Sequence, residues 1–260
     1  KPTLRMDARE LPFSAHLAEL RTSLRNSAIA VLIGFGASFY WAERLFRWLV
    51  KPLTDAMARA KLTEPLKFFD VIEPFFTYMK VAFFAGIFVS SPFVFHQIWR
   101  FISPGLYERE RRIAIPFAVS SALLFTGGAA FCYFLALPGV FDFLLTYRSD
   151  LLEPALSMRM QLDLELKLLV AFGLCFELPV LIFFLAYTGL VTHRSLWRFG
   201  RYAVVVIFIV AAILTPPDVI SQMFLALPLL ALYYISILIA YWVTKRREKR
   251  AAPAPDEKKT

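Results

Sequence analysis

Long apolar blocks separated by short polar or proline-rich connections dominate this chain. Each block runs for roughly 17–25 residues, the length of helix that crosses a ~30 Å hydrocarbon core at ~1.5 Å per residue. Lipid offers no hydrogen-bond partner to backbone N–H and C=O groups, so such blocks must be helical. The pattern predicts an all-α polytopic membrane protein with six spans, at about 24–42, 75–98, 113–137, 168–187, 202–214 and 219–243.

The last two spans are predicted to be short. Only about 13 apolar residues lie between Arg201 and Thr215, which gives ~20 Å of helix, and a Pro-Pro turn then leads directly into the sixth block. A span this short is accommodated by local thinning of the bilayer or by packing against neighbouring helices. Prolines inside or beside the apolar blocks can bend their helices, so we expect a curved scaffold with a concave wall; they are at positions 92, 116, 179 and 228.

Charge sets the expected topology. The net charge is +9, and the connections on the side of both termini hold 19 Lys and Arg against 8 on the other side. Positive loops stay in the cytoplasm and bind anionic lipid headgroups, so we expect both termini inside and no nucleic-acid partner. Residues 1–243 are interpreted as one membrane domain and 244–260 as a flexible basic tail.

Two segments are expected to lie along the membrane surface. The connection 43–74 is rich in Trp and Phe, which favours an interfacial position over a free loop. Before the first span, Phe13, Leu17, Leu20 and Leu24 recur at helical spacing, which predicts an amphipathic helix on the inner surface.

Glu177 is the most informative single residue by position, because it is the tenth of the twenty residues from 168 to 187. A charged group near the bilayer midplane costs ~2.5–3.5 kcal/mol even on the mildest scales, so this carboxyl should face protein or water. One alternative is a proton-coupled small-solute transporter that uses Glu177. Another is a carboxylic acid that only hydrogen-bonds a neighbouring helix.

Other polar residues have both a structural and a functional interpretation. In the inner loop 101–112, local pairing of carboxylates with arginines competes with capture of a cationic ligand by Glu110 together with Glu19. In the turn before the sixth span, Thr215 is predicted to cap the helix, with Asp218 as the acidic third residue. Gln222 is predicted to hydrogen-bond another helix.

Enzyme signatures are absent from the sequence. There is no phosphate loop, dinucleotide-binding fingerprint, HExxH pair or GxSxG elbow, and the three histidines are scattered. Cys132 and Cys175 lie in different apolar blocks and are interpreted as small hydrophobic residues. We therefore expect no catalytic residues, metal or cofactor, and a function in transport.

Four motifs in the same order among the six blocks resemble the TatC family, the multispanning receptor of the twin-arginine protein translocase. They are His16-Leu17-Ala18-Glu19-Leu20-Arg21, Phe101-x-x-Pro104-Gly105-Leu106-x-x-x-Glu110, Phe176-Glu177-x-Pro179, and Leu214-Thr215-Pro216-Pro217-Asp218-x-x-Ser221-Gln222. The resemblance extends from about residue 16 to residue 241.

The resemblance implies a multi-pass protein of the bacterial-type inner membrane that recognises twin-arginine signal peptides on folded cargo. It also implies assembly with single-span TatA- and TatB-like subunits, self-association in the complex, and transport driven by the proton motive force. The implied signal-peptide residues are Glu19, Arg21, Phe101, Pro104, Leu106 and Glu110. Glu177 and Gln222 would be intramembrane polar residues, and Pro216, Pro217 and Asp218 would form an outer turn that contacts partners.

Overall fold

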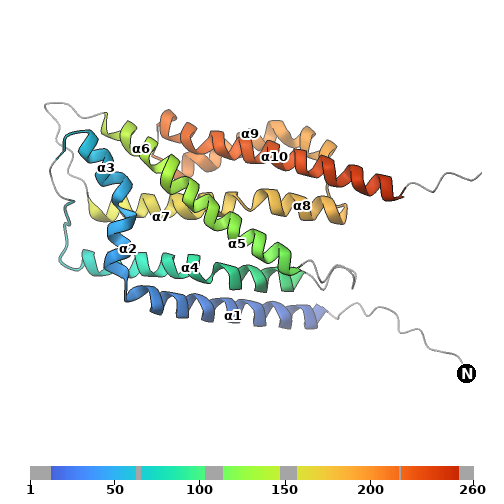
Figure 1. Ribbon diagram of the computed structural model, residues 1–260, viewed down its shortest axis with the longest axis horizontal. Helices are drawn as coiled ribbons and strands as arrows, with labels where there is room; N and C mark the ends of the chain where they lie inside the picture. Colours follow the sequence, from blue (N-terminus) through green and yellow to red (C-terminus); the bar gives the residue numbers. More distant parts are fainter. Residues whose placement is uncertain (1–12, 63–65, 103–113, 147–156, 217, 252–260) are drawn as a thin grey trace, which may run out of the picture. The chain divides into compact units, whose positions relative to one another are not determined.

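The computed structural model describes residues 13–62, 66–102, 114–146, 157–216 and 218–251. These residues are almost entirely helical, as a lipid-embedded chain requires; an isolated bridge joins Lys67 and Ser157. The helices are α1 (Phe13–Phe39), α2 (Ala42–Leu49), α3 (Lys51–Arg59), α4 (Glu73–Ile102), α5 (Ala114–Phe131), a π-helix (Cys132–Ala136), α6 (Leu137–Leu145), α7 (Met158–Cys175), α8 (Leu178–Thr188), α9 (His193–Leu214) and α10 (Val219–Ala251) (Figure 1).

Five stretches of the described residues are long and apolar enough to cross a bilayer by themselves. They are Glu73–Ile102, Ile115–Leu145, Met158–Thr188, His193–Leu214 and Val219–Arg246. The first helix passes the same test only when it is taken together with the helices that follow it, which brings the number to six. The prediction of an all-α membrane protein with six spans is confirmed.

The third span continues eight residues beyond its predicted end at residue 137. The next residue is Pro138, and a proline inside a helix lacks an N–H and its ring clashes with the carbonyl one turn earlier. The π-helix Cys132–Ala136 comes directly before, and the Leu137 N–H donates to the Cys132 carbonyl, one residue further back than in an α-helix. Pro138 then occupies the first turn of α6, where a missing N–H costs little.

The fourth span starts ten residues earlier than predicted, at Met158. The added residues include Asp163, Glu165 and Lys167, and all three lie within α7. Asp163 pairs with Lys80 at 2.7 Å, and the Glu165 side chain is completely buried. The span breaks at Phe176 and Glu177, just before Pro179, as the proline predicts.

Three other helices include charged segments that we had placed outside the spans. The predicted surface helix at the N-terminus and the first span form one continuous helix, α1. At the other end of the chain, α9 begins at His193 rather than 202, and α10 runs into the predicted tail as far as Ala251. Lys and Arg tolerate such positions because their long side chains reach the headgroups from a helix that continues past the hydrocarbon.

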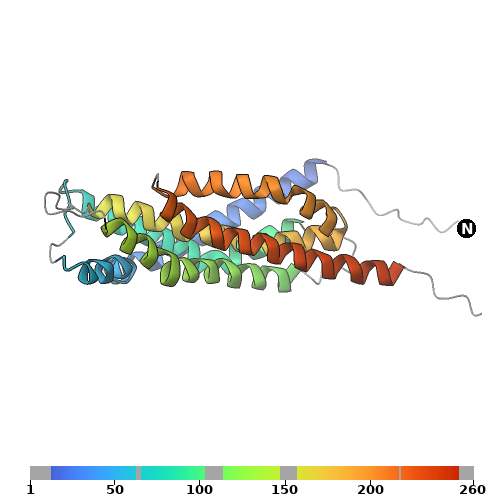
Figure 2. The same cartoon turned by 90° about the horizontal axis from the view of Figure 1, so that it is seen from above.

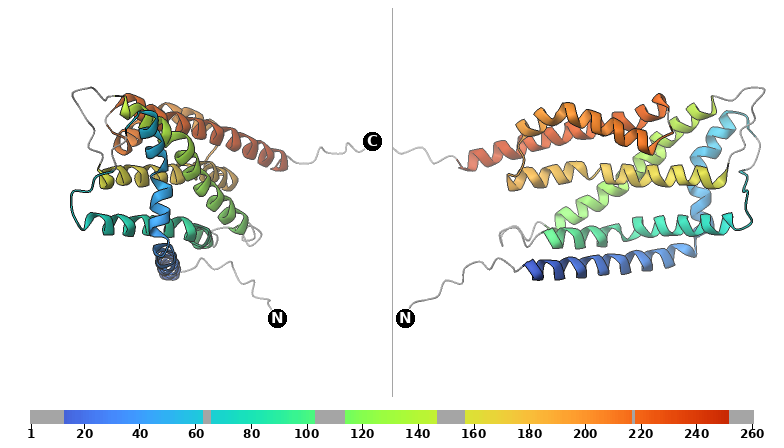
Figure 3. Two further views of the ribbon diagram at one scale, coloured as in Figure 1. Left: turned by 60° about the vertical axis from the view of Figure 1, so that its left-hand side comes forward. Right: turned by 180° about the vertical axis from the view of Figure 1, so that it is seen from behind.

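The chain divides into two compact units, and the first comprises Lys1–Trp41 and Ala82–Ala122. In this unit α1 and the second part of α4 run side by side in opposite directions (Figure 3). Their backbones touch at Gly34 and Gly86: a Cβ on Gly34 would lie 2.7 Å from the Gly86 carbonyl oxygen, and one on Gly86 would lie 2.5 Å from the Phe35 nitrogen. Small residues of this kind permit the close packing on which helix association in lipid depends.

The second unit comprises Ala42–Val81 and Leu123–Thr260. In it α10 packs along both α8 and α9 (Figure 2). Ile182 and Ala186 of α8 form a buried cluster with Ala240 of α10. The Tyr233 hydroxyl also donates to the Leu196 carbonyl at 2.7 Å, which ties α10 to the beginning of α9.

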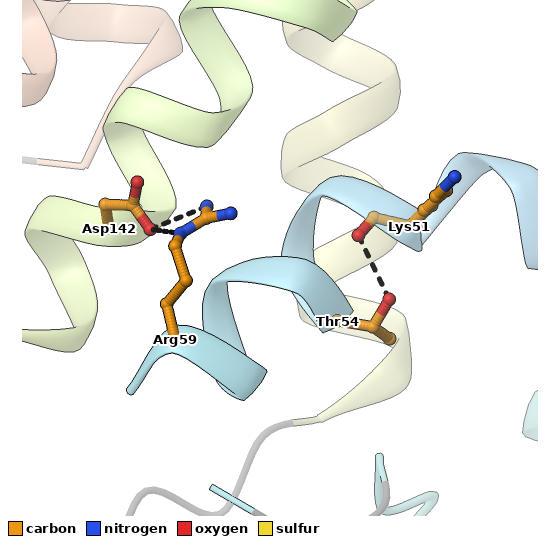
Figure 4. A network of polar contacts seen from close by, with 4 residues as sticks. All are labelled: Lys51, Thr54, Arg59 and Asp142. Carbon is orange, nitrogen blue, oxygen red and sulfur yellow. Dashed lines mark hydrogen bonds and ion pairs between the residues drawn. The ribbon is translucent and has the colours of Figure 1, made fainter. Parts of the chain in front are cut away.

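The connection 43–74 forms two helices, α2 and α3, that are attached to the third span within the second unit. The Trp48 ring stacks on Tyr133 at a centroid distance of 4.2 Å, and the Tyr133 hydroxyl donates to the Trp48 carbonyl at 2.6 Å. Arg59 at the end of α3 donates from Nε and Nη2 to one oxygen of Asp142 on α6, at 3.0 and 2.8 Å (Figure 4). The connection is therefore a packed layer rather than a free loop.

We expect the Arg59–Asp142 pair to contribute little to stability, because about half of each side chain is exposed. Exposed ion pairs contribute ~0.2–1 kcal/mol, so Asp142→Asn should lower the midpoint of thermal unfolding only slightly. Exchanging the two residues (R59D together with D142R) should restore most of that loss. Thermal unfolding of the purified protein in detergent at low and high salt measures both effects, and a large loss that the exchange does not restore would contradict the assignment.

Candidate functional site

A hollow of about 260 Å³ opens between the beginning of α1 and the end of α4, within the first unit. Polar side chains line most of it, with one carboxylate and one guanidinium among them. The lining residues are Ala18, Glu19, Thr22, Ser23, Gln97, Arg100 and Phe101.

The contact between Gly34 and Gly86 explains why Glu19 and Phe101 line the same hollow. The two helices are antiparallel, so a step back along α1 matches a step forward along α4. Fifteen residues separate Gly34 from Glu19, and fifteen separate Gly86 from Phe101. At ~1.5 Å per residue both steps are roughly 22 Å, which brings Glu19 and Phe101 to the same level.

The end of α4 is held in place by its packing against α5 in the same unit. The Trp99 indole N–H donates to Ser121 Oγ at 3.0 Å, and both side chains are buried. The Trp99 ring also packs against Phe117 at a centroid distance of 4.7 Å. Because Trp99 immediately precedes Arg100 and Phe101, this anchor orients the last turn of α4 at the hollow.

The electrostatics of the hollow favour a cationic ligand that can form directed hydrogen bonds. Glu19 is exposed and makes no ion pair with any described residue. Arg100 shares the hollow, and Arg21 and Arg25 line a second hollow on the neighbouring face of α1. These arginines repel any cation, but a guanidinium can offset the repulsion by forming two parallel hydrogen bonds with a carboxylate, which a compact ammonium group cannot do.

The structure brings together only some of the predicted signal-peptide residues. Glu19 and Phe101 line the same hollow, while Arg21 lines the adjoining one with Leu17, Ala18, Thr22 and Arg25. The remaining three, Pro104, Leu106 and Glu110, lie outside the described residues.

The turn between α9 and α10 differs from the prediction in its cap. The helix begins at Val219, so its cap is Asp218: the Ser221 N–H donates to Asp218 Oδ1 at 2.6 Å. Thr215 is instead the C-cap of the preceding helix, directly after Leu214, and its hydroxyl donates to the Ala211 carbonyl at 2.9 Å. The helix therefore starts three residues later than predicted, and the capping role moves from Thr215 to Asp218. Pro216 is half-buried, and Pro217 lies outside the described residues.

Gln222 connects the two helices of this hairpin, which confirms the predicted hydrogen bond to another helix. Its Nε2 donates to the Phe208 carbonyl of α9 at 2.9 Å. One turn earlier, the second oxygen of Asp218 is buried without a hydrogen-bond partner among the described residues, and so is Ser221 Oγ. The beginning of α10 therefore holds polar atoms with unused hydrogen-bonding capacity.

Glu177 lies in the second unit, at the break between α7 and α8, and is half-buried. Within the span Met158–Thr188 its position is four residues past the middle, or about 6 Å. The expectation of an intramembrane carboxyl near the midplane therefore agrees with the limits of the helix.

Sequence analysis did not identify three residues that have features of a functional site. Gln97 and Arg100 line the hollow with Glu19, but a single Gln or Arg near a helix end has no distinctive spacing. Glu165 was assigned to the connection before the fourth span, yet it is 0% exposed inside α7. Only the knowledge that α7 starts at Met158 would have revealed it as an intramembrane acid.

Comparison with known proteins identifies relatives over nearly the whole chain. The family of the Sec-independent protein translocase protein (TatC) matches residues 15–228. The TatC protein of Koribacter versatilis is 40% identical over 250 residues, which is 95% of this chain and 92% of that protein. The TatC protein of Aquifex aeolicus is 39% identical over 241 residues, 92% of this chain and 98% of its own length.

A solved structure agrees with the fold as well. A crystal structure of the twin-arginine translocase receptor TatC superposes with a TM-score of 0.79 and 40% sequence identity. The match covers 88% of this chain and 99% of that one.

Proposed function

Because the chain belongs to the TatC family of Sec-independent protein translocase proteins, we propose that it is the receptor for twin-arginine signal peptides of folded cargo. It is then a multi-pass membrane component of the twin-arginine translocase and not an enzyme. The observation that carries the proposal is the hollow in which Glu19 lies with Gln97, Arg100 and Phe101.

In this proposal Glu19 accepts two hydrogen bonds from one guanidinium of the peptide. Glu110 of the following loop receives the second arginine, and the Phe101 ring with Pro104 and Leu106 shapes the surface beside it. Arg21 and Arg100 disfavour a simple point charge, so an ammonium group gains less than a planar guanidinium. The pocket would thereby prefer Arg-Arg to Lys-Lys.

We further propose that the hollow faces the cytoplasm of a bacterial-type inner membrane, with both termini on that side. The excess of Lys and Arg in the connections on that side supports this orientation. Single-span TatA- and TatB-like subunits would bind beside α9 and α10, where Asp218 and Ser221 have unused polar atoms. Export would be driven by the proton motive force, with further copies of the chain in the complex.

Site-specific photocrosslinking tests the proposal directly. A photoreactive amino acid at position 18 or 23, which line the hollow and leave Glu19 in place, should crosslink to a signal peptide with Arg-Arg and only weakly to the same peptide with Lys-Lys. The control position is 36, in the last turn of α1, where Gly36 is exposed and an added Cβ would meet no atom within 4 Å. Equal crosslinking from positions 18, 23 and 36, or no preference for Arg-Arg, would exclude the hollow as the binding site.

A further inference from the structure

Glu165 is a carboxyl group inside the fourth span that the proposed receptor function does not use. It is 0% exposed, and neither of its oxygens has a hydrogen-bond partner among the described residues. One turn earlier on α7, Gln161 Nε2 is also buried without a partner in that part of the chain. Buried polar groups almost always have partners, so two such residues one turn apart on one helix face have hydrogen-bonding capacity that they could satisfy with each other.

Among the described residues, none supplies a free cation to Glu165. Lys80 is engaged by Asp163, and Lys167 is exposed, two residues along the helix and therefore on a different face. From the π-helix, Cys132 and Tyr133 lie within electrostatic range of the carboxyl.

Neither of these two groups can neutralise a carboxylate. The Tyr133 hydroxyl already donates to the Trp48 carbonyl, and a thiol is a weak donor. On α9, which also packs against α7, residues 203–214 contain no titratable side chain.

We propose that Glu165 is a proton-binding site, in which the neutral acid forms a hydrogen-bonded pair with the amide of Gln161. In this pair the acid O–H would donate to the amide oxygen and the amide N–H to the acid carbonyl. Rotation of the two side chains is needed to form it, because neither group has a partner in the described structure. Only the protonated acid can do this, because a carboxylate accepts but does not donate. Loss of the proton would break one hydrogen bond and leave an uncompensated charge in the span, which is costly.

Proton binding by Glu165 and Gln161 would take place next to an irregular part of the third span. The helix that carries Glu165 packs against the π-helix, the point at which the third span departs from α-helical hydrogen bonding. Such local widening of a helix often occurs at functional sites. Glu165 is also distinct from Glu177, which lies twelve residues later at the break between α7 and α8.

Infrared difference spectroscopy on the purified full-length protein tests the proposal without any transport assay. At neutral pH the difference between wild type and Glu165→Gln should contain the carbonyl band of one protonated carboxyl group, which is lost in the variant. Glu43→Gln is the matched control, because Glu43 is exposed and paired with Arg47, so that variant should lose only carboxylate bands. Gln161→Leu should shift the protonated band to higher frequency, since it removes the amide partner.

A second variant keeps the test decisive if Glu165→Gln fails to fold. Glu165→Asp retains an acid on a shorter stem, so its protonated band should persist at a shifted frequency. Loss of only carboxylate bands in Glu165→Gln, or a spectrum of Glu165→Asp without any protonated carboxyl band, would overturn the proposal. Because signal-peptide binding enters neither measurement, the result does not depend on the proposed receptor function.

Discussion

Replacing Glu19 by glutamine should weaken binding of a twin-arginine signal peptide about ten- to hundredfold and leave the protein folded in the membrane. Glutamine has nearly the same shape as glutamate but lacks the negative charge, so the hollow keeps its form. A hydrogen bond to a charged group contributes ~1.5–3 kcal/mol, and each ~1.4 kcal/mol corresponds to a tenfold change in Kd. Peptide titration of the purified protein measures the change.

The matched control for this variant is Glu43→Gln, which removes a carboxylate that pairs with Arg47 on α2, in the second unit. Its affinity for the peptide should equal that of the wild type. A Lys-Lys peptide should lose less affinity than the Arg-Arg peptide in Glu19→Gln, since it gains less from the carboxylate. Unchanged affinity in a variant that lacks the carboxyls of both Glu19 and Glu110 would refute the proposed recognition.

Valine in place of Gly86 should cause the largest loss of stability among the substitutions considered for the first unit. A Cβ at this position would lie 2.5 Å from the Phe35 nitrogen and 2.8 Å from the Gly34 carbonyl carbon, both of which are backbone atoms that cannot rotate away. Overpacking of this kind costs ~1–3 kcal/mol. Thermal unfolding in detergent measures the loss.

The same substitution should also weaken peptide binding, although position 86 is about 22 Å from the hollow along α4. The register of α1 and α4 brings Glu19 to the level of Phe101, and forcing the helices apart changes that register. Gly36→Val is the control on α1, because a Cβ at Gly36 meets no atom within 4 Å. Equal unfolding midpoints for the two variants would contradict the close contact.

The spans could be predicted from sequence because lipid demands long apolar helices, but several of their ends could not. Asp163 and Glu165 look like loop residues until the structure shows one paired with Lys80 and the other fully buried. Pro138 looks like a terminator until a π-helix precedes it. In both cases the partner or the backbone hydrogen bond that decides the outcome is absent from the local sequence.

The candidate site was predictable in part. Glu19 and Phe101 were identified through the resemblance of their motifs, and the structure places them around one hollow. Gln97 lines the same hollow because the contact between Gly34 and Gly86 determines how α1 and α4 align. A contact between two distant glycines produces no recognisable pattern in a single sequence. The cap of α10 was assigned to the wrong residue, Thr215, because the capping-box pattern starts the helix directly after it, whereas the helix starts at Val219 and Asp218 caps it.

The π-helix Cys132–Ala136 resets the helical phase of everything that follows it in the third span. One additional residue in a turn rotates all later side chains by about 100° around the helix axis. That rotation is what directs Val140 and Phe141 inward and points Asp142 toward Arg59. A one-residue deletion there would restore a regular α-helix but turn those three side chains away from their present neighbours. The number of residues in this turn therefore determines which side of α6 faces the core.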